Sequence, residues 1–113
     1  MAACVFCAIA AGKIPSKIVH EDPLVVAFRD IAPKAPTHVL VIPREHVDDL
    51  DAASPAHERL LGHLLLVAKE IAAKEGLGNG YRLVVNRGAD GGQTVDHLHV
   101  HLLGGRALRW PPG

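Results

Sequence analysis

Apolar runs, and runs in which apolar and polar residues alternate, divide the chain into short segments typical of β-strands. The first two segments are joined by Asp22-Pro23, a turn-forming pair, so they predict an antiparallel hairpin. The third segment is apolar almost without a break and ends at Pro43, which indicates a strand at the centre of the sheet. The five predicted strands cover residues 17–21, 25–29, 38–42, 81–86 and 97–103.

Two further segments predict helices. The longer covers residues 54–75, where leucines recur at three- and four-residue spacing behind Ser54-Pro55, and Gly76 ends it. The shorter covers residues 5–11. These elements predict one α+β domain over residues 1–113, with a five-stranded, mostly antiparallel sheet, one long helix against a face of that sheet and one short helix.

The last predicted strand carries three histidines, His97, His99 and His101, which alternate with apolar residues. Because successive side chains of a strand point to opposite faces, all three imidazoles should lie on one face, and the apolar residues should join the core. The run ahead of the strand, residues 88–92, is rich in glycine, so its backbone N–H groups can approach an anion closely. The pattern predicts a phosphate group held beside imidazoles.

Composition narrows the class of partner. The chain has 113 residues, 49% of them hydrophobic, and its 12 Lys and Arg balance its 12 Asp and Glu. Without a basic field we expect no nucleic-acid partner, and without a long apolar run or a secretory leader we expect no membrane contact. Cys4 and Cys7 are too close in sequence to staple a fold, which favours a reducing compartment. We expect a cytoplasmic protein with a small-molecule partner.

Several residues allow more than one interpretation. Alternating strand histidines can share a metal ion, act on a nucleotide, or simply lie in the core. The cysteine pair Cys4 and Cys7 can form a redox motif, contribute half of a zinc site, or remain as inert buried thiols. The redox interpretation is weak, because only three residues precede Cys4 and leave no room for a strand. Three histidines carry no motif and are expected at the surface or on a helix face: His20, His57 and His63.

Taken together, the motifs resemble those of the histidine triad (HIT) family, and more narrowly its Hint branch, the histidine triad nucleotide-binding proteins. The resemblance extends from Phe6 to Trp110. It rests on Pro36-Thr37-His38, Ile42-Pro43-Arg44-Glu45-His46, Val85-Asn86, Gly91-Gly92-Gln93 and the His-x-His-x-His strand that continues into Leu102-Leu103-Gly104-Gly105-Arg106.

The resemblance implies a purine nucleoside phosphoramidate hydrolase that works through a covalent nucleotidyl-histidine and releases a nucleoside monophosphate and an amine. It implies that His99 is the nucleophile, that His101 and His38 polarise the phosphate and relay protons, and that the backbone carbonyl of His97 selects the tautomer of His99. It also implies a homodimer in which two sheets join into one continuous sheet. Hydrolysis of dinucleoside polyphosphates, and a nucleotide-binding regulatory role with incidental hydrolysis, remain alternatives.

The resemblance further implies a set of substrate-binding residues. Asp30 matches a carboxylate that receives ribose hydroxyls. Trp110 is either a docked hydrophobic residue or, as the family's C-terminal tail suggests, a residue near the partner subunit's substrate, and we favour docking across the dimer. This sequence departs from the usual family pattern at Thr94, often a serine, and at Asp96, usually an aromatic residue. The apolar slot for the base matches Phe6, Ile9, Phe28, Ile31 and Leu40, and the phosphate-contacting residues match Asn86, Gly92, Gln93, Thr94 and Val95.

No cofactor is expected for catalysis, but the resemblance makes a structural zinc ion a candidate. In some members of the family, zinc lies between a cysteine pair and two histidines, which match Cys4, Cys7, His46 and His97 here. Two thiolates and two imidazoles form a closed tetrahedral site, as structural zinc requires.

Overall fold

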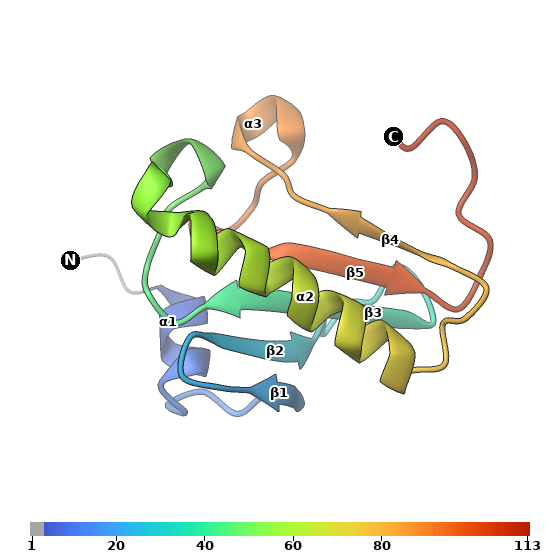
Figure 1. Cartoon of the computed structure of the whole chain (residues 1–113), viewed down its shortest axis with the longest axis horizontal. Helices are drawn as coiled ribbons and strands as arrows, with labels where there is room; N and C mark the ends of the chain where they lie inside the picture. Colours follow the sequence, from blue (N-terminus) through green and yellow to red (C-terminus); the bar gives the residue numbers. More distant parts are fainter. Residues whose placement is uncertain (1–3) are drawn as a thin grey trace.

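The computed structural model describes residues 4–113, which form one antiparallel sheet flanked by helices (Figure 1). The strand order is β1-β2-β3-β5-β4, and every neighbouring pair is antiparallel. The predicted α+β class and five-stranded sheet are therefore confirmed. The strands are β1 (Ile18–Glu21), β2 (Val25–Arg29), β3 (Thr37–Pro43), β4 (Tyr81–Val84) and β5 (Val100–Gly104).

The two predicted helices are both present. They are α1 (Val5–Ala10) and α2 (Glu58–Lys74), and Ser54 caps a short 3₁₀ turn (Pro55–His57) that leads into α2. A third helix, α3 (Gly88–Gly91), is a single turn that the glycine-rich sequence did not suggest, because glycine disfavours helices. Within residues 4–113, no helix has the length and apolar character needed to cross a bilayer.

The central strand β3 separates two apolar clusters. Val39 and Val41 face α2, whereas Leu40 and Ile42 face α1, and every residue of β3 is buried. This explains why its sequence is apolar without alternation: the strand has a core on both faces. Figure 1 shows α2 lying across one face of the sheet and α1 at one end of the strands.

The histidine strand begins later than predicted. Residues 97–103 were expected to be strand, but β5 starts at Val100, which pairs with Val41 near the end of β3. The residues before it hydrogen-bond to loops instead, and the Leu98 N–H donates to the Val47 carbonyl at 2.7 Å. The predicted strand 81–86 likewise ends early, at Val84. The alternation nevertheless persists, because Leu98, Val100 and Leu102 all join the core under α2.

A carboxylate ties the β1–β2 turn to α2. One oxygen of Asp22 lies 2.7 Å from Nε2 of both His20 and His63, and the other accepts the N–H groups of Leu24 and Val25. Two of the histidines without a motif therefore have a structural partner. Partial burial raises the pKa of the Asp22 carboxyl, but these four hydrogen bonds outweigh it and hold the pKa far below its usual range.

We predict that Asp22→Ala lowers the free energy of unfolding by about 1–3 kcal/mol at pH 7, because it removes hydrogen bonds to a charged group. The folded-state pKa lies below the unfolded value of about 4, so the contribution is complete above that pH and is lost as the pH falls toward the folded-state value. Urea denaturation from pH 7 to pH 3 measures it. In the control Glu21→Gln, whose carboxylate is exposed, the change should stay within about 0.5 kcal/mol; an equal loss in both variants would contradict the prediction.

Candidate active site and metal cluster

His99 is held in one orientation by the backbone. Its Nδ1 lies 2.6 Å from the carbonyl oxygen of His97, and the side chain of Phe6 packs edge-on against its ring. A carbonyl oxygen can only accept, so Nδ1 of His99 carries the proton and Nε2 keeps a free lone pair. This is the tautomer that a nucleophilic imidazole needs, as expected for His99.

A chain of hydrogen bonds assigns the protons of the next two histidines. The backbone N–H of Lys34 donates to Nδ1 of His38 at 3.1 Å, so in the neutral ring the proton is on Nε2. That nitrogen lies 2.9 Å from Nδ1 of His101, which must accept. The remaining proton of His101 is then on Nε2, a buried atom without a hydrogen-bond partner among the described residues. Asp30 lies beside this pair, with one oxygen 3.5 Å from Nε2 of His38.

Burial keeps the imidazoles of His38 and His101 neutral. It lowers the pKa of His101 to about 4, with further lowering from His99 and His38. Burial also lowers the pKa of His38, although the nearby Asp30 carboxylate opposes this. Near pH 7 these two rings therefore offer neutral N–H donors and lone pairs.

The rings of His99 and His101 line a cavity of about 420 Å³. It lies between α1, β2 and the turn ahead of β5, and its wall is mainly apolar. Ten of the residues predicted from the sequence line it: Phe6, Ile9, Phe28, Asp30, Ile31, Leu40, Thr94, Val95, His99 and His101.

Sequence reasoning missed four lining residues, Val5, Ile14, Pro15 and Ser16. The last three lie in the irregular segment between α1 and β1, which has no periodicity from which a contact could be inferred. Ile31, which is 98% exposed, also borders a second cavity of about 640 Å³ that shares Asp30 with the first. We assign the chemistry to the smaller cavity, because it alone of the two contains His99 and His101.

Other predicted substrate residues lie outside this wall. Asn86 follows β4, and Gly92 ends α3 with a φ of +82°, a conformation that suits glycine. Gln93 follows Gly92 and directs its side chain toward the loop after β3. Trp110, in the C-terminal tail, is 85% exposed in the single chain. His97 also lies outside the cavity wall, and only its carbonyl reaches His99.

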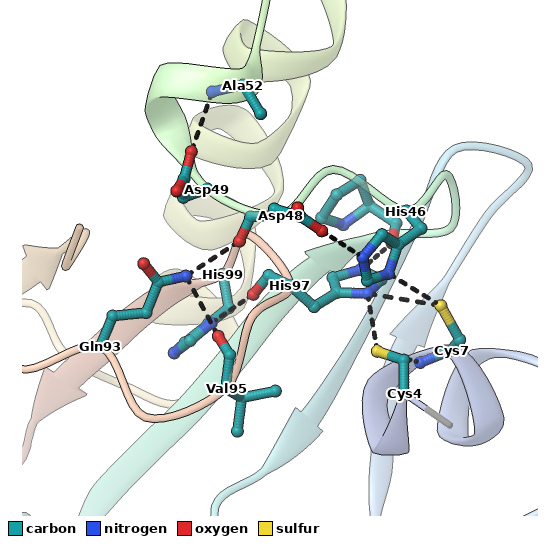
Figure 2. Close-up of polar contacts among 11 residues, drawn as sticks. Cys4, Cys7, His46, Asp48, Asp49, Ala52, Gln93, Val95, His97 and His99 are labelled. Carbon is teal, nitrogen blue, oxygen red and sulfur yellow. Dashed lines mark hydrogen bonds and ion pairs between the residues drawn. The ribbon is translucent and has the colours of Figure 1, made fainter. Parts of the chain in front are cut away.

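The expected cysteine and histidine ligands do come together. Cys4 and Cys7 at the start of α1 face His46 and His97, and their four ligand atoms all lie within 4.8 Å of one another (Figure 2). Nδ1 of His97 is 3.3 Å from the sulfur of Cys4, and Nδ1 of His46 is 3.2 Å from the sulfur of Cys7. Such separations match the edges of a tetrahedron around a zinc ion.

The outer nitrogens of both rings also suit a metal. Nε2 of His97 lies 2.8 Å from the Pro43 carbonyl, and Nε2 of His46 lies 2.6 Å from the Asp48 carboxylate. Both partners accept, so each Nε2 carries the proton and each Nδ1 directs its lone pair at the sulfurs. Burial raises the pKa of the Cys4 thiol, but hydrogen bonds from Cys7 and Phe6 outweigh it and leave the pKa lowered, whereas burial and the neighbouring Cys4 raise the pKa of the Cys7 thiol.

Comparisons with known proteins agree with this geometry. Residues 11–108 match the family model described as "HIT domain". An uncharacterized HIT-like protein of Synechococcus elongatus is 59% identical over 109 residues, 96% of both chains. A 14 kDa zinc-binding protein of Zea mays is 52% identical over 111 residues, 96% of this chain and 87% of the other.

Solved structures give the same result. A HIT family hydrolase from Legionella pneumophila superposes with a TM-score of 0.96 at 50% identity, covering 98% of this chain and 100% of that one. A histidine triad nucleotide-binding protein from Candida albicans gives 0.82 at 33% identity, covering 96% and 83%. With the HIT model matching most of its length, and with His97, His99 and His101 on the side of the sheet away from α2, the chain belongs to the histidine triad family.

Proposed function

We propose that this protein hydrolyses purine nucleoside phosphoramidates through a nucleotidyl intermediate on His99. One observation carries the proposal: the lone pair on Nε2 of His99 and the proton on Nε2 of His101 belong to adjacent rings of one cavity, with centroids 4.9 Å apart. A nucleophile and a donor at that spacing suit attack on phosphorus with departure of an amine.

In the first step, Nε2 of His99 attacks phosphorus and the P–N bond breaks, its electron pair remaining on nitrogen. A proton taken up together with the anionic substrate charges the His38–His101 pair, and Nε2 of His101 is placed to pass it to that nitrogen, which leaves both rings neutral. The nucleotidylated His99 ring is cationic, and its Nδ1–H donates to the His97 carbonyl, which stabilises the charge. In the second step a water oxygen attacks phosphorus, releases His99 and returns a proton to the relay.

The cavity suits a nucleoside. Phe6, Phe28 and Leu40 offer apolar surface for a base, and Asp30 stands at the rim as an acceptor for ribose hydroxyls. The residues of the turn, Thr94 and Val95, border the same cavity close to the two imidazoles. We assign the phosphate to the space between this turn and His99.

We also propose that Cys4, Cys7, His46 and His97 hold a structural zinc ion. The donor set and the protonation of both rings support it, and a zinc-binding relative is 52% identical to this chain. Zinc would fasten α1 to the loop after β3, and no catalytic step passes through it. We also propose a cytoplasmic location, because Cys4 and Cys7 form no disulfide and a reducing compartment keeps thiols available for a metal.

We further propose that two copies form a dimer across β4. This strand is an edge of the sheet, so the backbone groups on its outer side are open to pairing. Tyr81 on β4 and Leu66 on α2 are exposed apolar residues, and Trp110 is held nearby because Arg82 binds the Arg109 carbonyl. Joining the β4 edges of two copies would form one continuous sheet.

The nucleophile is tested with His99→Ala. We expect the turnover of an adenosine phosphoramidate to fall by at least about 10³-fold, because the lone pair that attacks phosphorus is lost, while AMP binding remains measurable. Steady-state kinetics and calorimetry measure the two effects, and mass spectrometry of quenched wild type should show one added nucleotidyl group.

His57→Gln is the matched control, since His57 lies outside the cavity, and it should keep wild-type turnover. Unchanged turnover in His99→Ala would refute the nucleophile. Dinucleoside polyphosphates belong in the same substrate panel. A best kcat/KM of about 10⁴ M⁻¹s⁻¹ or less would favour a regulatory role.

Metal analysis tests the zinc site. Protein purified without chelator should contain close to one zinc per chain, and Cys7→Ser should lose most of it, because the serine hydroxyl is a poor zinc ligand. Chelation should lower the melting temperature of the wild type, and added zinc should restore it. A wild-type zinc content of less than roughly a tenth of an equivalent per chain would contradict the proposal.

The dimer is tested by light scattering behind size exclusion. Wild type should have the mass of two chains, whereas Leu66→Lys should shift toward one, because a charge would be buried in the interface. Trp110 is the only tryptophan, so its fluorescence should shift to longer wavelength in the variant as its ring becomes hydrated. Leu50→Lys, on an exposed residue of the loop after β3, is the control; a wild type with the mass of one chain would contradict the prediction.

A further inference from the structure

The side chain of Gln93 makes three hydrogen bonds to the backbone. Its Oε1 accepts the Gly88 N–H at 3.0 Å, and its Nε2 lies 2.9 Å from the Asp48 carbonyl and 3.1 Å from the Val95 carbonyl. Figure 2 shows Gln93 reaching across from the turn to the segment that carries Asp48. One amide therefore joins both ends of the turn of residues 88–95 to the loop after β3.

These bonds leave Gln93 no donor for a phosphate. A glutamine amide has two N–H groups, and both are directed at carbonyl oxygens. The backbone N–H of Gln93 is also used, because it donates to the Gly88 carbonyl at 3.1 Å. The one acceptor, Oε1, cannot bond to a phosphate oxygen. A direct phosphate contact by Gln93, as its sequence motif suggested, would require one of these bonds to break.

The partner segment leads to the cysteine and histidine cluster. The backbone oxygen of Asp48 accepts from Gln93, and its carboxylate lies 2.6 Å from Nε2 of His46. Nδ1 of His46 in turn faces the sulfur of Cys7. A second connection runs through His97, whose ring faces the two sulfurs and whose carbonyl holds His99. The cluster thus reaches the catalytic cavity by two routes, one to the nucleophile and one to the turn.

We infer that Gln93 is a positioning residue that fastens the turn of residues 88–95 to the His46–Asp48 segment, and so couples the cluster to the catalytic cavity. The inference rests on the proposed function for the identity of the ligand in that cavity and for the zinc ion in the cluster, whereas the fastening of the turn depends on neither. Because coupling between two sites is reciprocal, a metal in the cluster should strengthen nucleotide binding by the factor by which the nucleotide strengthens metal binding.

Amide hydrogen exchange tests the fastening without any ligand. In Gln93→Ala the amides of residues 88–95 should exchange roughly tenfold faster than in the wild type, because three hydrogen bonds are lost. Gln93→Glu keeps the size and the acceptor for Gly88 but replaces both donors, so it should loosen the turn even if the alanine variant folds poorly. Asp90→Asn, an exposed position in the same turn, should exchange like the wild type.

Zinc release and AMP binding test the coupling. Zinc should pass to a chromogenic chelator several-fold faster from Gln93→Ala than from the wild type, and AMP should slow this release in the wild type more than in the variant. If both Gln93 variants exchange their amides and release zinc at the wild-type rates, and only their affinity for AMP is reduced, the inference is overturned in favour of a direct phosphate contact. If the wild type neither binds AMP nor hydrolyses phosphoramidates, the proposed function fails, whereas the exchange and zinc-release results still decide the role of Gln93.

Discussion

The site depends on which face of residues 97–103 packs against α2. Leu98, Val100 and Leu102 are almost fully buried under α2, and this packing directs the intervening imidazoles to the opposite side of the sheet. A shift of one residue would exchange the two faces, placing imidazoles in an apolar core at a cost of several kcal/mol. The hydrophobic packing against α2 therefore determines the chemistry on the other face.

The same burial determines the state of the imidazoles. His38 and His101 have lowered pKa values because they are removed from water; His38 uses both nitrogens in bonds within the protein, and His101 uses one. His99 uses Nδ1 in the same way. Each ring is thereby held in one tautomer, and His99 and His101 each keep one nitrogen for the ligand. A phosphate anion entering this cavity would meet donors that are already oriented, so little reorganisation would be needed on binding.

Tertiary packing accounts for the parts of the site that sequence patterns could not supply. The irregular segment with Ile14, Pro15 and Ser16 lines the cavity only because α1 folds against β2, and no period marks such a contact in advance. The late start of the predicted histidine strand has a similar cause. Pairing with β3 stops at Val100, and the preceding residues bond to a loop distant in sequence. His20 and His63 share Asp22 for the same reason: turn and helix meet only after folding.

The sequence by itself determined which strand is buried at the centre of the sheet, where the two main helices lie, and how imidazole and apolar side chains alternate. These features follow from periods of two and of three to four residues, which act locally. Its motifs, through the resemblance to the family, also named ten of the residues that line the cavity and the four of the cluster, although not their distances. The tertiary structure alone decided which nitrogen of each ring carries the proton, and that the amide of Gln93 is used entirely within the protein. Those properties depend on acceptors and donors contributed by segments far apart in the chain, whose positions no local pattern encodes.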